Sequence, residues 1–416
     1  MSIVCGIDFG TSNSTVAIVR DGDIMLVPLE GGATGIPSAI FHPAEGEPPL
    51  YGRAAVRAYT QREPGRLMRS LKSILGSDLI AERTPVGGRS QTFEAILVGF
   101  VRHLKEKAEA FAGSRIDKVV MGRPVHFVDG NEAADRRAED KLGDIARAAA
   151  FRSVAFQFEP IAAALSFEHT LKAPEIAFVA DIGGGTADFS VVAVGPQRRG
   201  RADRAGDILA NDGVRVGGTN LDMRLSMAAV MPHLGSQSKT LTGLELPRWP
   251  FLDLATWHSI HAVGGPKKRP LLKQILDDCA PPVLFERYME VVRRGTGHLI
   301  AGQVEAAKIA LTDAETVSID ISDALPVPPI SADRVMLETA ITHELERLRT
   351  TVAATIAASG RKASDMTALF LTGGTSAVPS VRRLLTGLLP SSRVIDGDLF
   401  DSVGFGLALD ARARLT

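Results

Sequence analysis

Two glycine-rich stretches, DFGTSNST at residues 8–15 and DIGGGTAD at residues 181–188, decide how this chain of 416 residues folds. In each stretch an aspartate ends a run of β-forming residues, and glycine then allows a tight turn into a second such run. Three glycines in a row would weaken a strand unless the backbone must approach another group closely. Because successive amides of such a turn can face a phosphate, the sequence predicts two phosphate-binding turns, one in each of two repeats.

The segments around these turns follow the same order twice. In the first copy we expect strands at 3–9, 13–20, 24–29, 118–121 and 154–157, with helices at 93–111, 132–149 and 161–171. In the second copy we expect strands at 176–181, 187–194, 209–216, 368–372 and 394–395, with helices at 334–359, 380–388 and from 402. This alternation predicts an α/β fold with two lobes made by duplication.

The two lobes are expected to divide the chain near residue 172. Lobe I takes residues 1–172 and is completed by 399–416, and lobe II takes residues 173–398. A subdomain insertion is expected in each lobe, at about 31–92 in lobe I and at about 224–300 in lobe II. In the first insertion we expect short helical pieces after a Pro/Gly-rich stretch at 31–52.

The composition narrows the classes of function. Lys plus Arg (47) nearly cancels Asp plus Glu (48), so no overall field attracts nucleic acid or an acidic membrane surface. Two cysteines, Cys5 and Cys279, are too few for a disulfide framework or a thiolate metal site, which favours a reducing cytoplasm. We find no apolar run of about 18 residues and no secretory signal, so we expect neither a membrane span nor secretion.

Side chains near the turns suit a metal ion and a nucleotide. Asp8, at a strand end, is well placed to hold water molecules of a magnesium ion, which keeps most of its hydration shell. Thr11 and Ser12 add hydroxyl donors. A third stretch, FLTGGTSAVP at 370–379, ends a strand on paired glycines and is a candidate for the adenosine. No Gly-x-x-x-x-Gly-Lys-Ser/Thr element occurs, which removes the P-loop class.

Taken together, these stretches resemble the nucleotide-site motifs of the actin-like ATPases. The two turns, FEPIAAA at 158–164, the paired glycines at 373–374 and SVGFG at 402–406 agree with that family in order and spacing. The chain is most similar to the ATPase domains of the heat-shock-protein-70 (DnaK) family, and within it to the stand-alone YegD-type proteins. LKSILG at 71–76 resembles the segment with that family's catalytic lysine, and GGTNLD at 217–222 resembles its strand-to-helix turn. The resemblance implies a two-lobed fold of duplicated ribonuclease-H-like βββαβαβα lobes.

The resemblance also implies a site for ATP or ADP with Mg²⁺. Asp8 and Asp181 would organise the hydrated metal, mainly through water. Glu159 and Asp188 would hold metal waters and the attacking water, and Lys72 would lie beside the γ-phosphate. The implied nucleotide contacts are Gly10, Thr11, Ser12, Asn13, Gly183, Gly184, Gly185, Thr186, Gly217, Gly218, Glu305, Lys308, Thr312, Gly373, Gly374, Thr375 and Asp401.

Several residues have simpler interpretations that stay open at this point. Lys72 could be a solvated surface lysine, and Glu305 with Lys308 could be an i,i+3 surface ion pair. The basic runs at 198–204 and 267–269 favour solvated loops, with a docking surface as the alternative. Residues 235–282 show no regular pattern and are expected to form an irregular insertion.

Two departures from the family shape the expected function. Ile309 and Ala377 stand where the chaperones have arginines that sandwich adenine, so weaker or less base-specific nucleotide binding is expected. We also expect no peptide-binding domain after the last helix, which leads to Thr416. We therefore expect a monomeric, chaperone-like Mg-dependent ATPase with slow turnover that acts on an unidentified protein partner or co-chaperone. The alternatives are a nucleotide-sensing scaffold with little hydrolysis, an actin-like filament former and, less compatible with Lys72 and Glu159, a sugar kinase.

Overall fold

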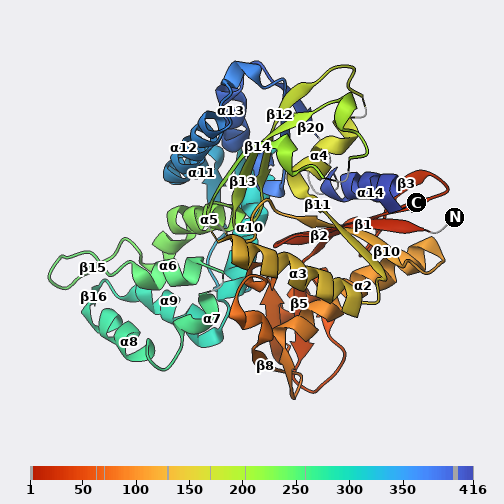
Figure 1. The fold of residues 1–416 in the computed structure, drawn as a ribbon. Helices are drawn as coiled ribbons and strands as arrows, with labels where there is room; N and C mark the ends of the chain where they lie inside the picture. The colour runs from red at the N-terminus through yellow and green to blue at the C-terminus, as the bar shows by residue number, and fades with distance from the viewer. Residues whose placement is uncertain are drawn as a thin grey trace.

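The computed structural model describes residues 3–61, 63–69, 71–128, 131–168, 170–201, 203–257, 259–396 and 402–415. These residues form two lobes, each built on a mixed β-sheet with helices against it (Figure 1). Within the described ranges, none of the helices combines the length and the hydropathy that a bilayer crossing requires.

The sheet of the first lobe has the strand order β11-β10-β1-β2-β3. Its strands are β1 (Val4–Phe9), β2 (Asn13–Arg20), β3 (Asp23–Leu26), β10 (Lys118–Arg123) and β11 (Ser153–Phe158). The first three strands are antiparallel neighbours, whereas β10 runs parallel to β1 and β11 runs parallel to β10. A short strand, β4 (Gly35–Pro37), also pairs with β2.

The sheet of the second lobe repeats this topology, with the order β14-β13-β12-β19-β20. Its strands are β12 (Glu175–Ile182), β13 (Ala187–Val194), β14 (Ile208–Val214), β19 (Ala368–Thr372) and β20 (Arg393–Asp396). Again the first three are antiparallel neighbours, and β19 and β20 continue the sheet in parallel with β12. The two-lobed α/β fold with duplicated lobes that the sequence predicted is therefore confirmed.

One face of each sheet carries helices from its own lobe. In the first lobe α2 (Phe93–Ala112) and α3 (Glu132–Ala148) bury the apolar side chains that alternate along β1 and β10. In the second lobe α12 (Thr342–Ala358) and α13 (Pro379–Leu388) do the same for β12 and β19. Because strand side chains alternate between faces, the opposite faces need other partners.

Two helices cover those opposite faces, and each has crossed to the other lobe. The helix after β11, α4 (Glu159–Glu168), packs with apolar residues of β12, β13 and β19, while α14 (Ser402–Leu415), which follows β20, packs on β1, β2 and β10. Both lie between the sheets in Figure 1. A Cβ at Gly406 would overlap the carbonyl oxygen of Ala162, so the two helices cross with no side chain between them at that point.

The insertion of the first lobe is more β-rich than expected. It holds α1 (Gly52–Thr60) against a sheet of β5 (Ala39–Pro43), β6 (Leu50–Tyr51) and β7 (Gly65–Arg69), followed by the hairpin of β8 (Arg83–Val86) and β9 (Arg89–Thr92). The sequence predicted only short helical pieces here, because prolines and glycines obscure the strand pattern.

The second insertion is mostly helical. It contains α5 (Gly218–Leu225), α6 (Trp249–Ala255), α7 (Ile260–Val263), α8 (Arg269–Asp278), α9 (Val283–Arg294) and α10 (Gly297–Ala310). A two-stranded sheet joins β15 (Lys239–Thr240) to β16 (Cys279–Ala280). The expectation of an irregular segment at 235–282 was wrong, because proline begins α6 and α8 near their first turn rather than ending them.

The chain then returns to the second sheet through the hairpin of β17 (Thr316–Ile319) and β18 (Ile330–Asp333). The single helix predicted at 334–359 is instead two helices, α11 (Arg334–Ala340) and α12, separated at the fully buried Ile341. This break lets α11 pack against α5 while α12 packs on the sheet.

Candidate functional site

The two glycine turns occupy equivalent places in the two lobes and touch each other. Phe9 pairs with Ser14 and Ile182 pairs with Ala187, so four residues lie between the last paired positions of each hairpin. Ser12 Oγ lies 2.6 Å from the position that a Cβ at Gly184 would occupy. A Cβ at Gly184 would force the Ser12 hydroxyl to move, so glycine lets the two turns approach each other this closely.

Protein donors bind the carbonyl groups of the first turn. Ser38 donates its hydroxyl to the carbonyl of Gly10 at 2.7 Å and its amide to the carbonyl of Ser12 at 2.8 Å. Thr11 lies between them, and Asn13 is the first residue of β2. With the carbonyls turned toward the protein, the turn is suited to present amides to an anion.

The second turn is held in the same way. The carbonyl of Gly183 accepts from the Gly218 amide at 3.0 Å and from the Thr375 hydroxyl at 2.8 Å, and the carbonyl of Gly184 accepts from the Thr219 amide at 2.8 Å. A Cβ at Gly217 would lie 2.5 Å from backbone atoms of the turn. The space on the Cβ side of Gly185 is open.

Four carboxylates and one lysine gather beneath the turns. Asp8 and Asp181 take matching positions near the ends of β1 and β12, and Asp188 of β13 is the strand partner of Asp181. Glu159 is the first residue of α4. Lys72, in the 3₁₀ turn Leu71–Ile74, is buried, and its Nζ lies 2.6 Å from Glu159 Oε1. The interpretation of Lys72 as a solvated surface lysine is therefore wrong.

The clustering of these charges raises the carboxylate pKa values. Burial and the charge of Glu159 raise the pKa of Asp8 to about 8 and that of Asp181 to about 6. Burial and the charge of Asp181 raise the pKa of Asp188 to about 7. Burial alone would lower the pKa of Lys72, but Glu159 and Asp8 outweigh it and the pKa rises. The site thus holds excess negative charge that a bound cation would relieve.

The donor set fits a hydrated magnesium ion better than a dehydrated one. Among the described residues, no three His, Cys, Asp or Glu side chains are grouped so that they could hold a metal ion directly. Asp8 and Asp181 carry oxygen ligands, which Mg²⁺ prefers, and Mg²⁺ retains several of its waters in protein sites.

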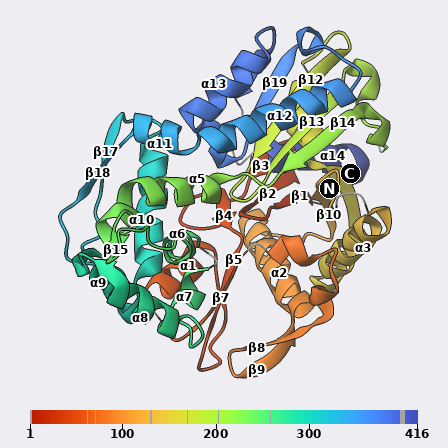
Figure 2. The same cartoon turned by 90° about the vertical axis from the view of Figure 1, so that its left-hand side faces the viewer.

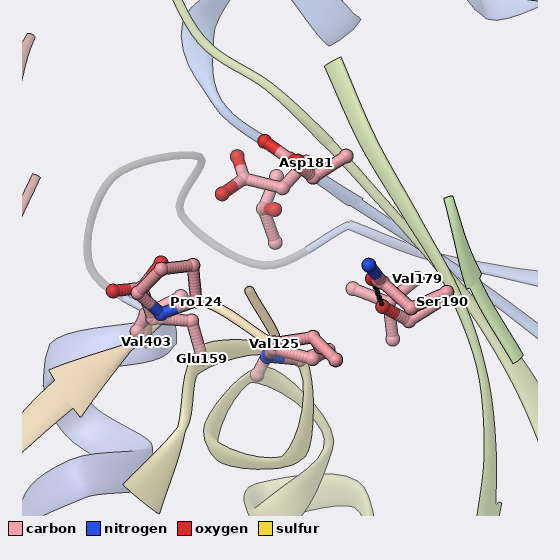
Figure 3. Close-up of a pocket in the computed structure, with 12 residues that line it drawn as sticks. Pro124, Val125, Glu159, Val179, Asp181, Ser190 and Val403 are labelled. Atoms are coloured by element: carbon pink, nitrogen blue, oxygen red, sulfur yellow. Dashed lines mark hydrogen bonds between the residues drawn. The ribbon is translucent and has the colours of Figure 1, made fainter. Parts of the chain in front are cut away.

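A small cavity lies beside the carboxylates, between the lobes. It holds about 30 Å³, room for one or two water molecules. Its wall includes Pro124, Val125, Glu159, Asp181 and Asp188. Figure 3 shows Glu159 and Asp181 on different sides of this space, with Pro124 and Val125 closing it near Glu159. A water molecule here would be close to ionisable groups of both lobes.

Arg123 was not predicted as a site residue, and it holds Pro124 and Val125 in place at the cavity wall. Its guanidinium donates to the carbonyls of Pro124 at 3.0 Å and Val125 at 3.1 Å. It also pairs with Asp135 at 2.7 Å and with Glu139, both on α3. It lies over the rings of Phe127 and Phe158, 5.4 and 4.9 Å from the centroids. Phe158 directly precedes Glu159, so Arg123 supports both the wall and the start of α4. The sequence signal that could have identified this residue is an arginine at the end of a strand, directly before a proline.

Lys308 and Glu305 do not form the surface ion pair that the spacing allowed. Lys308 is buried, and its Nζ lies 2.8 Å from Asp222 Oδ1 and 3.4 Å from the carbonyl oxygen of Gly218. Burial raises the pKa of Asp222 to about 6 against the lowering effect of Lys308. Glu305 is half-buried on the same helix, and Thr312 is half-buried just after it. Asp222 belongs to the GGTNLD motif at 217–222, but the sequence alone does not identify it as the partner of Lys308.

The paired glycines at 373–374 pack against the second glycine turn. Gly373 has a φ of +75°, which favours glycine, and a Cβ there would overlap the carbonyl of Ile182. Gly374 and Thr375 begin the next 3₁₀ turn, and Thr375 Oγ1 lies 2.9 Å from a Cβ placed at Gly218. Ile309, on α10, is 60% exposed. Asp401 lies outside the described residues.

The two insertions also touch each other. Tyr59 Oη of α1 lies 3.2 Å from the ring nitrogens of His298 on α10, and the ring centroids are 4.7 Å apart. Trp257 packs edge-on against His298, and Arg69 of β7 lies over the Trp257 ring. Figure 2 shows α1 beside α10. This aromatic contact joins segments 239 residues apart.

The duplicated sheets, the exchanged helices and the facing glycine turns define the fold of the actin-like ATPases. The profile described as Hsp70 protein matches residues 51–240. The chaperone protein DnaK of Akkermansia muciniphila is 28% identical over 420 residues, which cover 92% of this chain. The match covers 54% of that chaperone, so the chain spans about half the length of the curated relative that it matches. The chain is thus similar to the Hsp70 profile over residues 51–240 and to the DnaK chaperone over most of its own length.

Proposed function

We propose that this protein is a chaperone-like ATPase of the YegD type, which binds ATP or ADP with Mg²⁺ between its lobes and hydrolyses ATP slowly. The observation that supports this most is the contact between Ser12 of the first turn and Gly184 of the second. Two equivalent turns that meet with their carbonyls turned into the protein suit a chain of phosphates held from both sides.

The proposed roles follow from the geometry around the turns. Residues 10–13 and 183–186 would hold the phosphates through amides and hydroxyls. Asp8 and Asp181 would hold water ligands of Mg²⁺, which neutralises phosphate charge when bound. The nucleoside would be surrounded by Gly217, Gly218, Glu305, Lys308, Thr312 and residues 373–375.

The hydrolytic step would use the Lys72–Glu159 pair and Asp188. Lys72 is buried and within 2.6 Å of one carboxylate, so it can move its positive charge toward a phosphate without loss of solvation. Glu159 and Asp188 line the water-sized cavity, and the pKa of Asp188 of about 7 suits a group that accepts a proton near neutrality.

The residues at the expected adenine position favour weaker binding of the base. Ile309 is 60% exposed on α10, and Ala377 is half-buried at the end of its 3₁₀ turn. Neither can supply the cation–π contact of an arginine, worth about 0.5 to 2 kcal/mol each. We therefore propose that the protein binds nucleotide with modest affinity and little base preference. An unidentified protein partner would respond to the bound nucleotide.

Phosphate release with and without Mg²⁺ tests the enzyme part of the proposal. Lys72→Ala should lose turnover but keep ADP binding in calorimetry, while Lys267→Ala, at an exposed loop position, should match the parent. If the parent releases no more phosphate than Lys72→Ala, the ATPase proposal fails. Nucleotide binding without turnover would then favour the sensing scaffold, and ATP-dependent light scattering would favour the filament former.

A further inference from the structure

The connection between β13 and β14, described at residues 195–201 and 203–207, carries four arginines, and we call these described residues the arginine loop. The sequence favoured a solvated loop, but Arg204 is buried with its side chain 1% exposed. It donates to Glu168 Oε2 at 3.0 Å and to Asp207, and both carboxylates are also buried. Since a buried ion pair contributes little net stability, its main effect here is to fix the loop in one arrangement.

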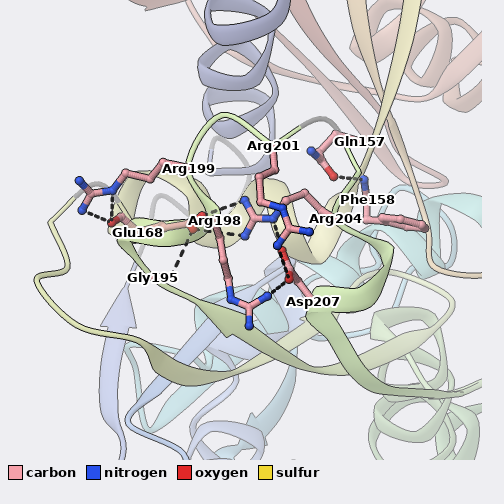
Figure 4. Close-up of polar contacts among 9 residues, drawn as sticks. All are labelled: Gln157, Phe158, Glu168, Gly195, Arg198, Arg199, Arg201, Arg204 and Asp207. Carbon is pink, nitrogen blue, oxygen red and sulfur yellow. Dashed lines mark hydrogen bonds and ion pairs between the residues drawn. The ribbon is translucent and has the colours of Figure 1, made fainter.

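Three guanidinium groups of the loop share one carboxylate. Arg198 pairs with Asp207 Oδ1, and Arg201 Nη1 lies 3.9 Å from the same oxygen. Arg204 pairs with the other carboxylate oxygen, Asp207 Oδ2 (Figure 4). The side chain of Arg201 is 56% exposed. Burial and the charges of Arg204 and Arg201 lower the pKa of Arg198, as expected where cations crowd together. The outer part of the loop therefore has donors and positive charge in excess.

The neighbouring residues increase this excess. Arg199 is exposed and donates to the carbonyls of Glu168 and Leu171, at the C-terminal end of α4. Lys172, which follows, is exposed as well. Among the described residues of 168–172 and 195–207, Asp203 is the one exposed carboxylate. Arg198, Arg199, Arg201 and Lys172 thus form a fixed cationic surface around a single solvent-facing acid.

This surface is connected to the candidate active site by one helix. Glu168, which Arg204 binds, is the last residue of α4, and Glu159, which pairs with Lys72, is the first. Ten residues of α-helix span about 15 Å. The apolar side chains of α4 are packed between the two sheets, so a shift of one end is transmitted to the other.

We propose that the arginine loop docks an acidic segment of a partner protein, and that this contact acts on Glu159 through α4. The second half rests on the ATPase function proposed above. Arginine binds carboxylates with two parallel hydrogen bonds, and a loop already fixed by Arg204 loses little entropy on binding. These cations lie on one short loop and at the neighbouring Lys172, in a chain with net charge −1, whereas nucleic-acid binding uses extended basic grooves.

Fluorescence anisotropy with labelled hexaglutamate tests the docking, without nucleotide and at low ionic strength, where screening is weak. Arg201→Gln and Arg199→Gln should each weaken binding about five- to tenfold, as expected for loss of one charge-assisted contact. Arg136→Gln on α3, whose side chain is 76% exposed, removes the same charge from the other lobe and should bind like the parent. Equal binding by all variants, or no binding by the parent, overturns the proposal. So does tighter binding of a labelled ten-residue oligothymidine.

The coupling has its own measurement. Saturating hexaglutamate should change the steady-state ATP turnover of the parent at least twofold, and should leave Arg201→Gln unchanged at the same concentration. Bound peptide without any change in turnover refutes the coupling through α4. If the parent shows no turnover at all, the proposed ATPase fails while the docking result stands, so the two failures are distinguishable.

Discussion

Replacing Asp181 with asparagine should stabilise the nucleotide-free protein while it removes the proposed turnover. Burial and the charge of Glu159 raise the pKa of Asp181 from its ordinary value of 3.8 to about 6. The difference corresponds to about 3 kcal/mol of unfavourable free energy for the ionised form in the folded protein. The side chain is partly reached by solvent, and screening reduces this to about 2 kcal/mol.

The stability gained by Asp181→Asn should increase as the pH rises. The folded state holds the proton of Asp181 more tightly than the unfolded state, so stability is highest below pH 3.8 and falls as pH rises through about 6. Asparagine cannot ionise, and its advantage should be complete at pH 8 and absent near pH 4. For a lobe of about 200 residues, 2 kcal/mol corresponds to roughly 4 to 8 °C in melting temperature.

Thermal melting of the parent and the variant at both pH values provides the test. Asp323→Asn, at an exposed position, is the matched control and should leave the melting temperature unchanged. Mg-ADP should raise the melting temperature of the parent more than that of Asp181→Asn, since the metal relieves the repulsion in the parent. A variant that melts at or below the parent at pH 8, or gains equally at pH 4, would refute this account of the carboxylate cluster.

Four further changes test other parts of the site. Gly217→Ala places a Cβ 2.5 Å from backbone atoms of the second turn and should weaken Mg-ADP binding more than tenfold in calorimetry; Gly387→Ala, with nothing within 4 Å, should not, and equal affinities would contradict a role of the turn. Arg123→Met should lower turnover about tenfold, with partial recovery in Arg123→Lys and ADP affinity within twofold; a parallel loss of affinity would show a general structural effect. Ile309→Arg should tighten ATP binding by about 0.5 to 2 kcal/mol, and no change would place the base elsewhere. Tyr59→Ala breaks the 3.2 Å contact between the insertions and should speed release of a fluorescent ADP analogue severalfold in stopped flow, unless the contact is unrelated to nucleotide exit.

The duplicated sheets could be predicted from sequence because their strands are apolar, short and bounded by turn residues. Strands 13–20, 187–194 and 368–372 have the same limits in the structure as in the prediction. The insertions were harder, since their elements are short and each packs against segments distant in the chain. The break at Ile341 illustrates this difficulty: the helical pattern continues through it, and tertiary packing ends the helix.

The candidate site was predictable where glycine and aspartate have few alternative explanations. The turns and the aspartates behind them meet in space as the repeat suggested, although their roles stay predictions. What the sequence could not show was pairing between distant side chains. Lys308 has one acidic candidate by helical spacing, Glu305, whereas the fold pairs it with Asp222. Arg123 is absent from the prediction because its value depends on two rings and two carboxylates that only the fold brings together.

The exchange of α4 and α14 makes the two lobes depend on each other for solubility. If the chain were cut after α4, the first half would lack the helix that covers β1 and β10, and the second half would lack the one that covers β12 and β19. Each fragment would expose a flat apolar sheet face, the kind of surface that drives aggregation. The duplicated halves could therefore not have persisted in this form as separate chains. A split version of this protein should recover only when each piece retains the helix that its own sheet requires.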